Sequence, residues 1–210
     1  MKVENTIVSG IENALRVAGF PMAETVEKAN DKTPEQQMKV AKHLACTGTG
    51  EAHDQFLTGI TVTFDVTGSI QWWQEAERYR FLYFISSQSK MHRANKMGIN
   101  ECCNKYVDEE IMFVCRHLQK EYNKLNEAYK AGDSRVTKED VDEAFYRMIY
   151  NIPSGFEYTA GMVTNYRQLK TIYGQRKNHR LNEWKEFCKW IESLPESHLI
   201  TGYFDKKEGK

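Results

Sequence analysis

The sequence predicts an α+β protein in which a small, mostly antiparallel sheet packs with several long helices. One observation is a segment over residues 59–67, whose apolar residues alternate at positions 60, 62, 64 and 66 as in a half-buried strand. The other is a series of segments in the second half of the chain, where apolar residues recur at helical spacing. The chain has 210 residues, and we expect a single domain over residues 1–210.

In the first half of the chain, helix caps mark the predicted elements. Thr33 and Pro34 are typical of a helix start, because threonine caps the first turn and proline fits its first position. Ser69 has the same capping chemistry after the strand. The predicted elements are a helix over 33–46, a turn over 47–50, the strand over 59–67, a helix over 69–79, and a segment over 81–85 that fits a strand or a buried loop.

The second half of the chain is predicted to be mainly helical. Thr137 is a further helix cap, Gly132 is a typical helix stop, and Pro195 marks the end of another helix. The predicted elements are helices over 111–129, from 137, over 156–176 and over 181–194, an extended segment over 147–152, and a charged, frayed tail over 205–210.

Composition excludes several classes of protein. Lys plus Arg number 29 and Asp plus Glu number 29, which argues against a nucleic-acid partner bound by bulk positive charge. The mean hydropathy is −0.66, and no apolar run approaches the roughly 20 residues of a membrane span, so we expect no membrane partner. The N-terminal residues contain no continuous apolar stretch that would serve as a secretory signal.

The chain has five cysteines, without a CxxC pair or a zinc-binding pattern. This usage predicts reduced thiols in a cytoplasmic protein and no metal site. We expect Cys115 and Cys188 in the core, because both lie on apolar helical stripes.

Two polar segments in the first half are candidate ligand-binding sites. His53 follows the glycine-containing turn, where its imidazole could bond a phosphate or a carbonyl, although a loop histidine is more often a surface or cap residue. Arg78 and Arg80, followed by the polar run Ser86–Lys90, have the donors of an anion site. The alternative is a solvated helix face, in which both arginines pair with nearby glutamates.

A third candidate comprises Asn165, Arg167 and Arg176 on the helix predicted over 156–176. Eleven residues at about 100° each return to the same helix face, so Asn165 and Arg176 would project together while Arg167 points elsewhere. Such a division can serve different sites in an oligomer, and the alternative is an ordinary amphipathic helix. We expect Arg176 to be a helix-surface residue that contributes little stability.

The chain lacks common motifs for phosphate binding and hydrolysis, namely GxGxxG, GxxxxGK[ST], HExxH and GxSxG. A Rossmann or P-loop mode of phosphate binding is therefore not expected. Any nucleotide would be held by arginine side chains.

Taken in order, these segments resemble the flavin-dependent thymidylate synthases, and the order and most spacings agree over roughly residues 40–190. The matching segments are His53-Asp54, Thr63-Phe64, Arg78-Tyr79-Arg80, Ser86–Lys90, Arg147, Ile152-Pro153, Tyr158-Thr159, Asn165-Tyr166-Arg167 and Arg176. The sequence departs from the family at Tyr79, where the family has histidine, and at Thr58-Gly59, where it has Glu-His. The family's Ser-x-Arg-Tyr ending is kept only loosely around Lys90.

The resemblance implies the fold of that family and the reductive methylation of dUMP to dTMP. Methylenetetrahydrofolate would supply the methylene group, FAD the hydride and NADPH the reducing equivalents. The resemblance also implies a small-molecule nucleotide partner and a cytoplasmic homotetramer with active sites between subunits. It assigns FAD to His53, Arg78, Arg80, Asn165 and Arg167, and it assigns the nucleotide to Glu75, Gln88, Ser89, Lys90, Arg147 and Arg176.

The resemblance makes Arg176 the catalytic residue, because a guanidinium near the pyrimidine carbonyl would stabilise negative charge that develops on the ring. The departures leave two alternatives open. One is a related fold that modifies another pyrimidine nucleotide, and the other is a non-catalytic homologue that binds a nucleotide or a flavin.

Overall fold

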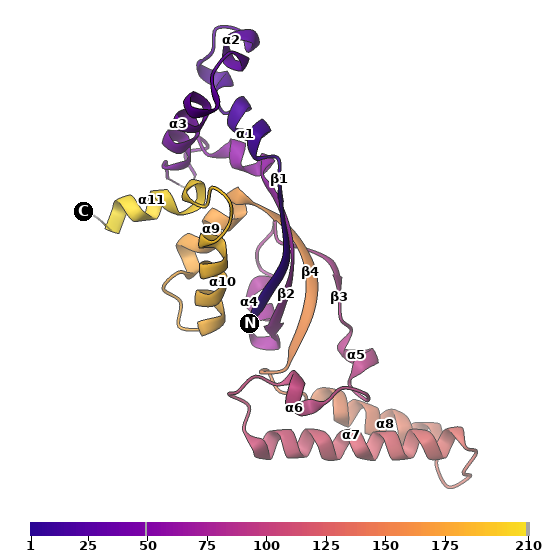
Figure 1. The fold of residues 1–210 in the computed structure, drawn as a ribbon. Helices are drawn as coiled ribbons and strands as arrows, with labels where there is room; N and C mark the ends of the chain where they lie inside the picture. The colour runs from indigo at the N-terminus through magenta and orange to yellow at the C-terminus, as the bar shows by residue number, and fades with distance from the viewer. Residues whose placement is uncertain (49, 209–210) are drawn as a thin grey trace. The chain divides into compact units, whose positions relative to one another are not determined.

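The computed structural model describes residues 1–48 and 50–208, with side chains up to residue 205 within that range. It is an α+β fold with a four-stranded antiparallel sheet in the order β1-β2-β4-β3, as the sequence predicted (Figure 1). The strands are β1 Lys2–Ser9, β2 Thr61–Ser69, β3 Tyr83–Ser87 and β4 Glu157–Asn165. The helices are α1 Ile11–Val17, η1 Phe20–Met22, α2 Val26–Asn30, α3 Pro34–Ala45, η2 Gln55–Gly59, α4 Ile70–Ala76, α5 Lys90–Arg93, α6 Ile99–Cys102, α7 Glu109–Lys130, α8 Lys138–Tyr150, α9 Tyr166–Arg176, α10 Asn182–Glu192 and α11 His198–Glu208.

The chain divides into two compact units. Unit 1 comprises residues 1–66, 75–85 and 161 onward, and unit 2 comprises residues 67–74 and 86–160. The expectation of a single domain stays a prediction. No helix in the described ranges is both long and apolar enough to cross a membrane.

The predicted helix caps are confirmed. Thr33 and Thr137 each accept a hydrogen bond from a backbone N–H three residues later. In return, the side chains of Gln36 and Asp140 accept a bond from the backbone N–H of the cap residue. Ser69 Oγ accepts from Trp72 N at 3.2 Å, so α4 begins where predicted. This helix ends at Ala76, three residues before the predicted end.

The predictions for the segment over 147–152 and for the C-terminal tail were wrong. The segment over 147–152 is not extended, because α8 continues to Tyr150 and buries Met148 and Ile149 on the stripe that begins with Val141. The predicted frayed tail over 205–210 is helical up to Glu208, within α11. Gly209 and Lys210 of that tail, and Thr49 of the predicted turn, lie outside the described residues.

The helix predicted over 156–176 is a strand followed by a shorter helix. In β4, Ala160, Met162 and Thr164 are buried at every second position, which is the period of a strand between two neighbours. Asn165 precedes α9 as its cap and accepts from Gln168 N at 2.9 Å. Asn165 and Arg176 therefore do not share a helix face, contrary to the prediction.

The two edge strands of the sheet were the least visible in the sequence. The segment over 81–85, which fitted a strand or a loop, contributes to the edge strand β3, and β1 was not predicted. All five residues of β3 and most of β1 are solvent-exposed. Edge strands with this exposure lack the apolar alternation that identifies β2.

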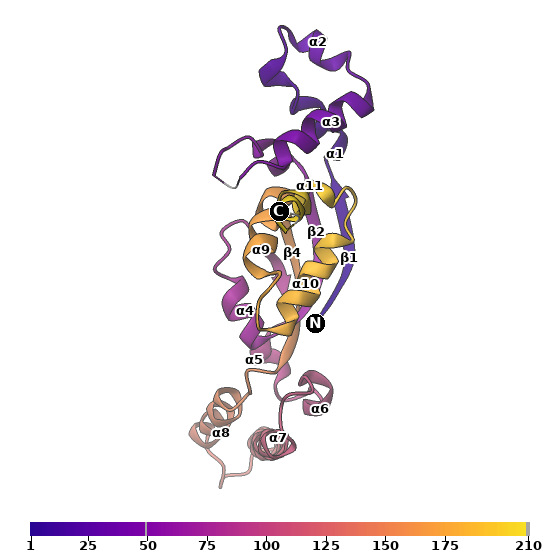
Figure 2. The same ribbon diagram turned by 90° about the vertical axis from the view of Figure 1, so that its left-hand side faces the viewer.

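In unit 1, aromatic side chains join the sheet to α10. Phe64 on β2 has its ring centroid 4.4 Å from that of Trp190 and 6.0 Å from that of Phe187. Figure 2 looks onto the face of the strands that α9 and α10 cover. Cys188 is buried in the same helix, as predicted. The helix α9, which carries the candidate site, packs in turn against α10.

Unit 2 contains the hairpin of α7 and α8. Its core includes Cys115, which is buried as predicted, with Leu118, Met148 and Phe156. The rings of Tyr122 and Phe145 lie 5.4 Å apart between the two helices. The hairpin is thus held by side chains on the predicted helical stripes.

Candidate functional site

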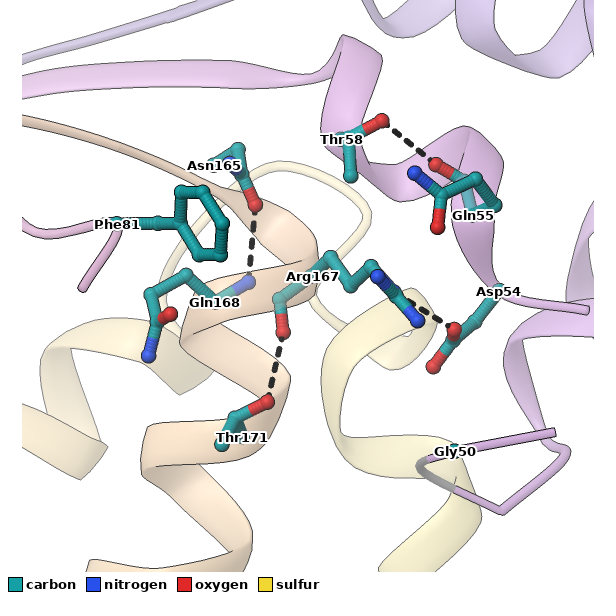
Figure 3. A pocket seen from close by; sticks show the side chains of 9 residues that line it. All are labelled: Gly50, Asp54, Gln55, Thr58, Phe81, Asn165, Arg167, Gln168 and Thr171. Atoms are coloured by element: carbon teal, nitrogen blue, oxygen red, sulfur yellow. Dashed lines mark hydrogen bonds and ion pairs between the residues drawn. The ribbon is translucent and has the colours of Figure 1, made fainter. Parts of the chain in front are cut away.

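A cavity of about 370 Å³ lies in unit 1 beside the N-terminal end of α9. Two of the predicted site residues, Asn165 and Arg167, line it, while the remaining predicted residues lie elsewhere. The lining residues are Gly50, Asp54, Gln55, Thr58, Phe81, Asn165, Arg167, Gln168 and Thr171 (Figure 3). Segments from three distant parts of the sequence therefore converge on one concave surface.

The cap of α9 explains how Asn165 reaches this cavity. Its Oδ1 is used in the cap, accepting from Gln168 N, which leaves Nδ2 with no partner among residues 1–48 and 50–208. Asn165 ends a strand and begins a helix, so its backbone is held on both sides. The amide of Asn165, which lines the cavity, thus keeps its Nδ2 donor available.

Asp54 and Arg167 belong to one wall of the cavity, and Lys170, which does not line it, pairs with the same buried carboxylate. Arg167 Nε donates to Asp54 Oδ1 at 3.0 Å, and Lys170 Nζ donates to Asp54 Oδ2 at 2.7 Å. The side chains of Asp54 and Lys170 are 1% and 0% exposed, whereas that of Arg167 is 34% exposed. One negative charge against two positive charges leaves this wall with a net positive charge, which favours an anionic ligand.

Figure 3 shows the Arg167 side chain extending from α9 toward Asp54. Only its Nε is engaged, and neither terminal guanidinium nitrogen has a hydrogen-bond partner in the described part of the chain. The two terminal nitrogens of a guanidinium form a planar fork that is able to bind a phosphate in bidentate fashion.

Lys170 is a functional candidate that the sequence reasoning missed. Its ammonium group donates to Asp54 and to the carbonyl oxygens of Ala45 and Thr47, both at 2.8 Å. These three acceptors satisfy the three donors of a fully buried lysine. The available signal was a lysine within the apolar run of α9, between Leu169 and Ile172.

His53 faces a different cavity, of about 850 Å³ in the same unit. Gln55 lines both cavities, so η2 separates them. The second cavity is lined by Val17, Ala18, Pro21, Met22, Lys39, Val40, His43, Leu44, Ala52, His53, Gln55 and Phe56. Its walls are mainly apolar, and the described residues that line it include the basic side chains Lys39, His43 and His53 but no acidic one.

Arg78 and Arg80 are solvent-exposed on the segment after α4. The Arg80 guanidinium lies 5.6 Å from the ring centre of Phe81, which lines the first cavity. Tyr79, between the two arginines, is buried and points away from solvent. The structure thus separates the Arg78-Tyr79-Arg80 segment into an exposed pair and a core residue.

Arg176 and Glu75 are brought together, but in a cluster of their own. Arg176 Nη1 donates to Glu75 Oε2 at 2.8 Å and Arg176 Nε donates to Tyr79 Oη at 2.7 Å. Trp184 Nε1 donates to the same Glu75 oxygen at 2.9 Å, and the Arg176 guanidinium lies 4.7 Å from the Trp184 ring centre. Burial raises the pKa of Tyr79, and the bond from Arg176 opposes that shift.

The other predicted nucleotide residues lie in unit 2. Ser89 caps α5, whose first residue is Lys90, and Gln88 Oε1 accepts from Thr159 N at 3.1 Å. Arg147 on α8 pairs with Glu121 on α7 at 2.9 Å. No hydrogen bond or ion pair within the described residues joins Arg147 to the segment over 88–90.

No protein-family model matches the sequence, and no curated protein is similar to it in sequence. Solved structures are similar in fold. The flavin-dependent thymidylate synthase ThyX from Helicobacter pylori, complexed with FAD and dUMP, matches in one structure with a TM-score of 0.60 at 16% identity, over 95% of this chain and 96% of that chain. A second structure of that enzyme with FAD and dUMP matches with a TM-score of 0.61 at 16% identity, over 97% of this chain and 99% of that chain.

The UMP/dUMP methylase PolB from Streptomyces cacaoi, bound with 5-Br dUMP, matches with a TM-score of 0.55 at 15% identity. That match covers 95% of each chain. The protein is therefore an α+β chain of the ThyX fold, over nearly its whole length. This confirms the fold that the order of the sequence motifs predicted.

Proposed function

We propose that this chain is a flavin-dependent methylase of a pyrimidine nucleotide, and that it converts dUMP to dTMP. Its carbon donor would be methylenetetrahydrofolate, its cofactor FAD and its reductant NADPH. The fold likeness to proteins crystallised with FAD and dUMP supports the proposal. The observation that carries it is the net positive cluster of Arg167, Lys170 and Asp54, of which Asp54 and Arg167 line a cavity in that fold.

The residues of the first cavity fit a flavin nucleotide. Arg167 offers two unpaired guanidinium nitrogens to a phosphate, and Asn165 offers an amide donor. The Phe81 ring is 46% exposed and provides an apolar surface for a planar group. A cavity of about 370 Å³ is large enough for part of a dinucleotide, because small-molecule sites range over about 300–1,000 Å³.

FAD, when bound, supplies the hydride. The role of the chain is to hold the phosphates at Arg167 and to present the nucleotide to the flavin. We place His53, Arg78 and Arg80 with the flavin as further contacts. The location of His53 in the neighbouring cavity, across η2, supports a ligand that extends past that helix.

Arg176 is suited to the catalytic role because its guanidinium is held in place. Glu75 and Tyr79 fix Nη1 and Nε, while Nη2 has no partner among the residues described. A donor with this orientation can stabilise negative charge on a pyrimidine carbonyl without reorganising during the reaction. We extend the nucleotide site to Gln88, Ser89, Lys90 and Arg147, and we propose a cytoplasmic homotetramer with active sites between subunits.

The test begins with the visible spectrum of the purified protein, before and after addition of FAD. We expect flavin absorbance and dUMP-dependent oxidation of NADPH in the presence of methylenetetrahydrofolate. Arg176→Lys should lower turnover while flavin absorbance is retained. A protein that takes up no flavin and shows no nucleotide-dependent oxidation would contradict the proposal.

A second candidate is the methylation of a different pyrimidine nucleotide, which the likeness to a UMP/dUMP methylase favours. The chain also places a carboxylate, Glu75, beside the proposed catalytic arginine. Turnover assays with dUMP, UMP and dCMP distinguish the two candidates, and strict dUMP preference would eliminate the second. Nucleotide binding without any turnover would instead support a non-catalytic homologue.

A further inference from the structure

We propose that Lys170 is a positioning residue, which acts through Asp54 to orient the guanidinium of Arg167 and so sets the affinity of the cavity for the phosphates of FAD. This inference rests on the proposed function. It concerns a lysine that touches no ligand, since its side chain is 0% exposed.

The first effect of Lys170 is mechanical. Lys170 links α9 to the end of α3 and to the segment that follows α3. Its ammonium group donates to the carbonyls of Ala45 and Thr47 and to the carboxylate of Asp54. Both elements contribute to the lining of the cavity: α9 carries Arg167, and the segment after Thr47 carries Asp54. The bonds of one buried side chain thus hold the two elements in register.

The second effect of Lys170 is electrostatic. Asp54 has one carboxylate oxygen for each cation, with Oδ2 on Lys170 and Oδ1 on Arg167. Because Lys170 occupies Oδ2, Arg167 is limited to a single bond through Nε, and its terminal nitrogens stay available to a ligand. Without the lysine, a buried carboxylate would draw the guanidinium into a bidentate pair and leave the wall with no net charge.

The experiment is a double-mutant cycle read by the Kd for FAD. Lys170→Met, Arg167→Met and the double variant are compared with the wild type in absorbance titrations at low and high salt. We expect each single variant to weaken FAD binding by about tenfold and to reduce its salt dependence. Arg167→Met removes the charge-assisted phosphate interaction itself, and Lys170→Met lets Asp54 draw the guanidinium away from the phosphate. Because both substitutions act through the guanidinium of Arg167, the double variant should bind FAD no more weakly than Arg167→Met does.

Lys177→Met is the matched control, because Lys177 follows the same helix and its ammonium group lies near the rings of Tyr173 and Phe204. We expect it to keep the wild-type Kd within about twofold. Multiplicative effects of Lys170→Met and Arg167→Met would overturn the proposal, because Lys170 would then act independently of Arg167. An unchanged Kd in Lys170→Met would overturn it as well.

Backbone hydrogen exchange gives a readout that needs no ligand. Lys170→Met should speed backbone exchange over residues 45–48 and 51–55, relative to Lys177→Met. Unchanged exchange there would overturn the mechanical effect of Lys170. If the wild type takes up no FAD, the proposed function fails and this readout still tests the role of Lys170. If Lys170→Met does not fold, Asp54→Asn combined with Lys170→Met removes both buried charges and should show the same loss of protection.

Discussion

Arg176 and Glu75 are 101 residues apart in the sequence and form an ion pair whose N–O distance is 2.8 Å. Tyr79 and Trp184 complete the cluster by bonding the guanidinium and the carboxylate respectively. The Arg176 side chain is 16% exposed. The sequence predicted a helix-surface arginine with little effect on stability, whereas the tertiary structure places its guanidinium in a mostly buried cluster of unit 1.

We predict that Arg176→Ala lowers the free energy of unfolding by about 2 kcal/mol, because it removes the guanidinium that pairs with Glu75 and donates to Tyr79. For a chain of this size the Tm should fall by about 4–8 °C in thermal unfolding. Arg180→Ala, at an exposed position nearby, is the control and should change the free energy by less than about 0.5 kcal/mol. Equal effects of the two variants would refute a structural role for the cluster.

Phe64→Ala should cost about 3–5 kcal/mol in chemical denaturation. The Phe64 side chain is 2% exposed and packs on Phe187 and Trp190, so its removal leaves a cavity between β2 and α10. Phe113→Ala makes the same chemical change at a position that is 65% exposed and should be nearly neutral. A Phe64→Ala variant as stable as Phe113→Ala would mean that the sheet is not covered by α10.

Gly10 and Gly132 provide a matched pair, because both have a positive φ, of 88° and 81°. A Cβ at Gly10 would lie 2.3 Å from the carbonyl oxygen of Gly59, whereas a Cβ at Gly132 would meet nothing within 4 Å. Gly132→Ala should therefore show only the conformational cost, about 1–2 kcal/mol. Gly10→Ala should cost about 1–3 kcal/mol more, because of the backbone clash. Similar unfolding midpoints for the two variants would show that Gly59 yields without strain.

Stability should decline at alkaline pH in a way that depends on Cys188. This thiol is buried, and burial raises its pKa from 9.0 to about 12. Above pH 9 the unfolded chain releases the thiol proton of Cys188, whereas the folded chain keeps it. The contribution of this thiol to the free energy of unfolding is therefore fully present below pH 9 and is lost as the pH rises toward 12.

The measurement is the free energy of unfolding of the wild type and of Cys188→Ala between pH 8 and 10.5. The wild type should lose about 2 kcal/mol more than the variant over this range, because each pKa unit is worth about 1.4 kcal/mol. Cys103, whose pKa burial raises to about 11, contributes to the slope of both proteins and cancels in the comparison. Parallel pH profiles would show that Cys188 reaches solvent in the folded state.

The predictions from sequence succeeded where structure is decided by neighbouring residues. Thr33 and Thr137 cap helices through bonds to residues three positions later, and β2 alternates within nine residues, so both signals are local. The strand β4 was predicted as a helix because the apolar residues of this short segment fit both the helical and the strand periodicity. The segment forms a strand because it lies between β2 and β3, which offer backbone hydrogen-bond partners on both sides.

For the candidate site too, the sequence revealed the local features but not the contacts between distant residues. The order of the motifs, with Asn165 and Arg167 near the start of a helix, was readable from the sequence, and it predicted the fold that the solved structures share. The partners of these side chains were not readable. Lys170 bonds Asp54 across 116 residues, and nothing in either local sequence specifies the other.

By itself, therefore, the sequence determined the helix caps, the alternating strand and the succession of basic and amide side chains. Only the tertiary structure decided that Asp54 is shared by Arg167 and Lys170, and that Arg176 is held by Glu75 and Tyr79. The physical reason is that a cap or a periodicity arises from a few adjacent residues, whereas a buried charge acquires its partner only when distant segments pack together.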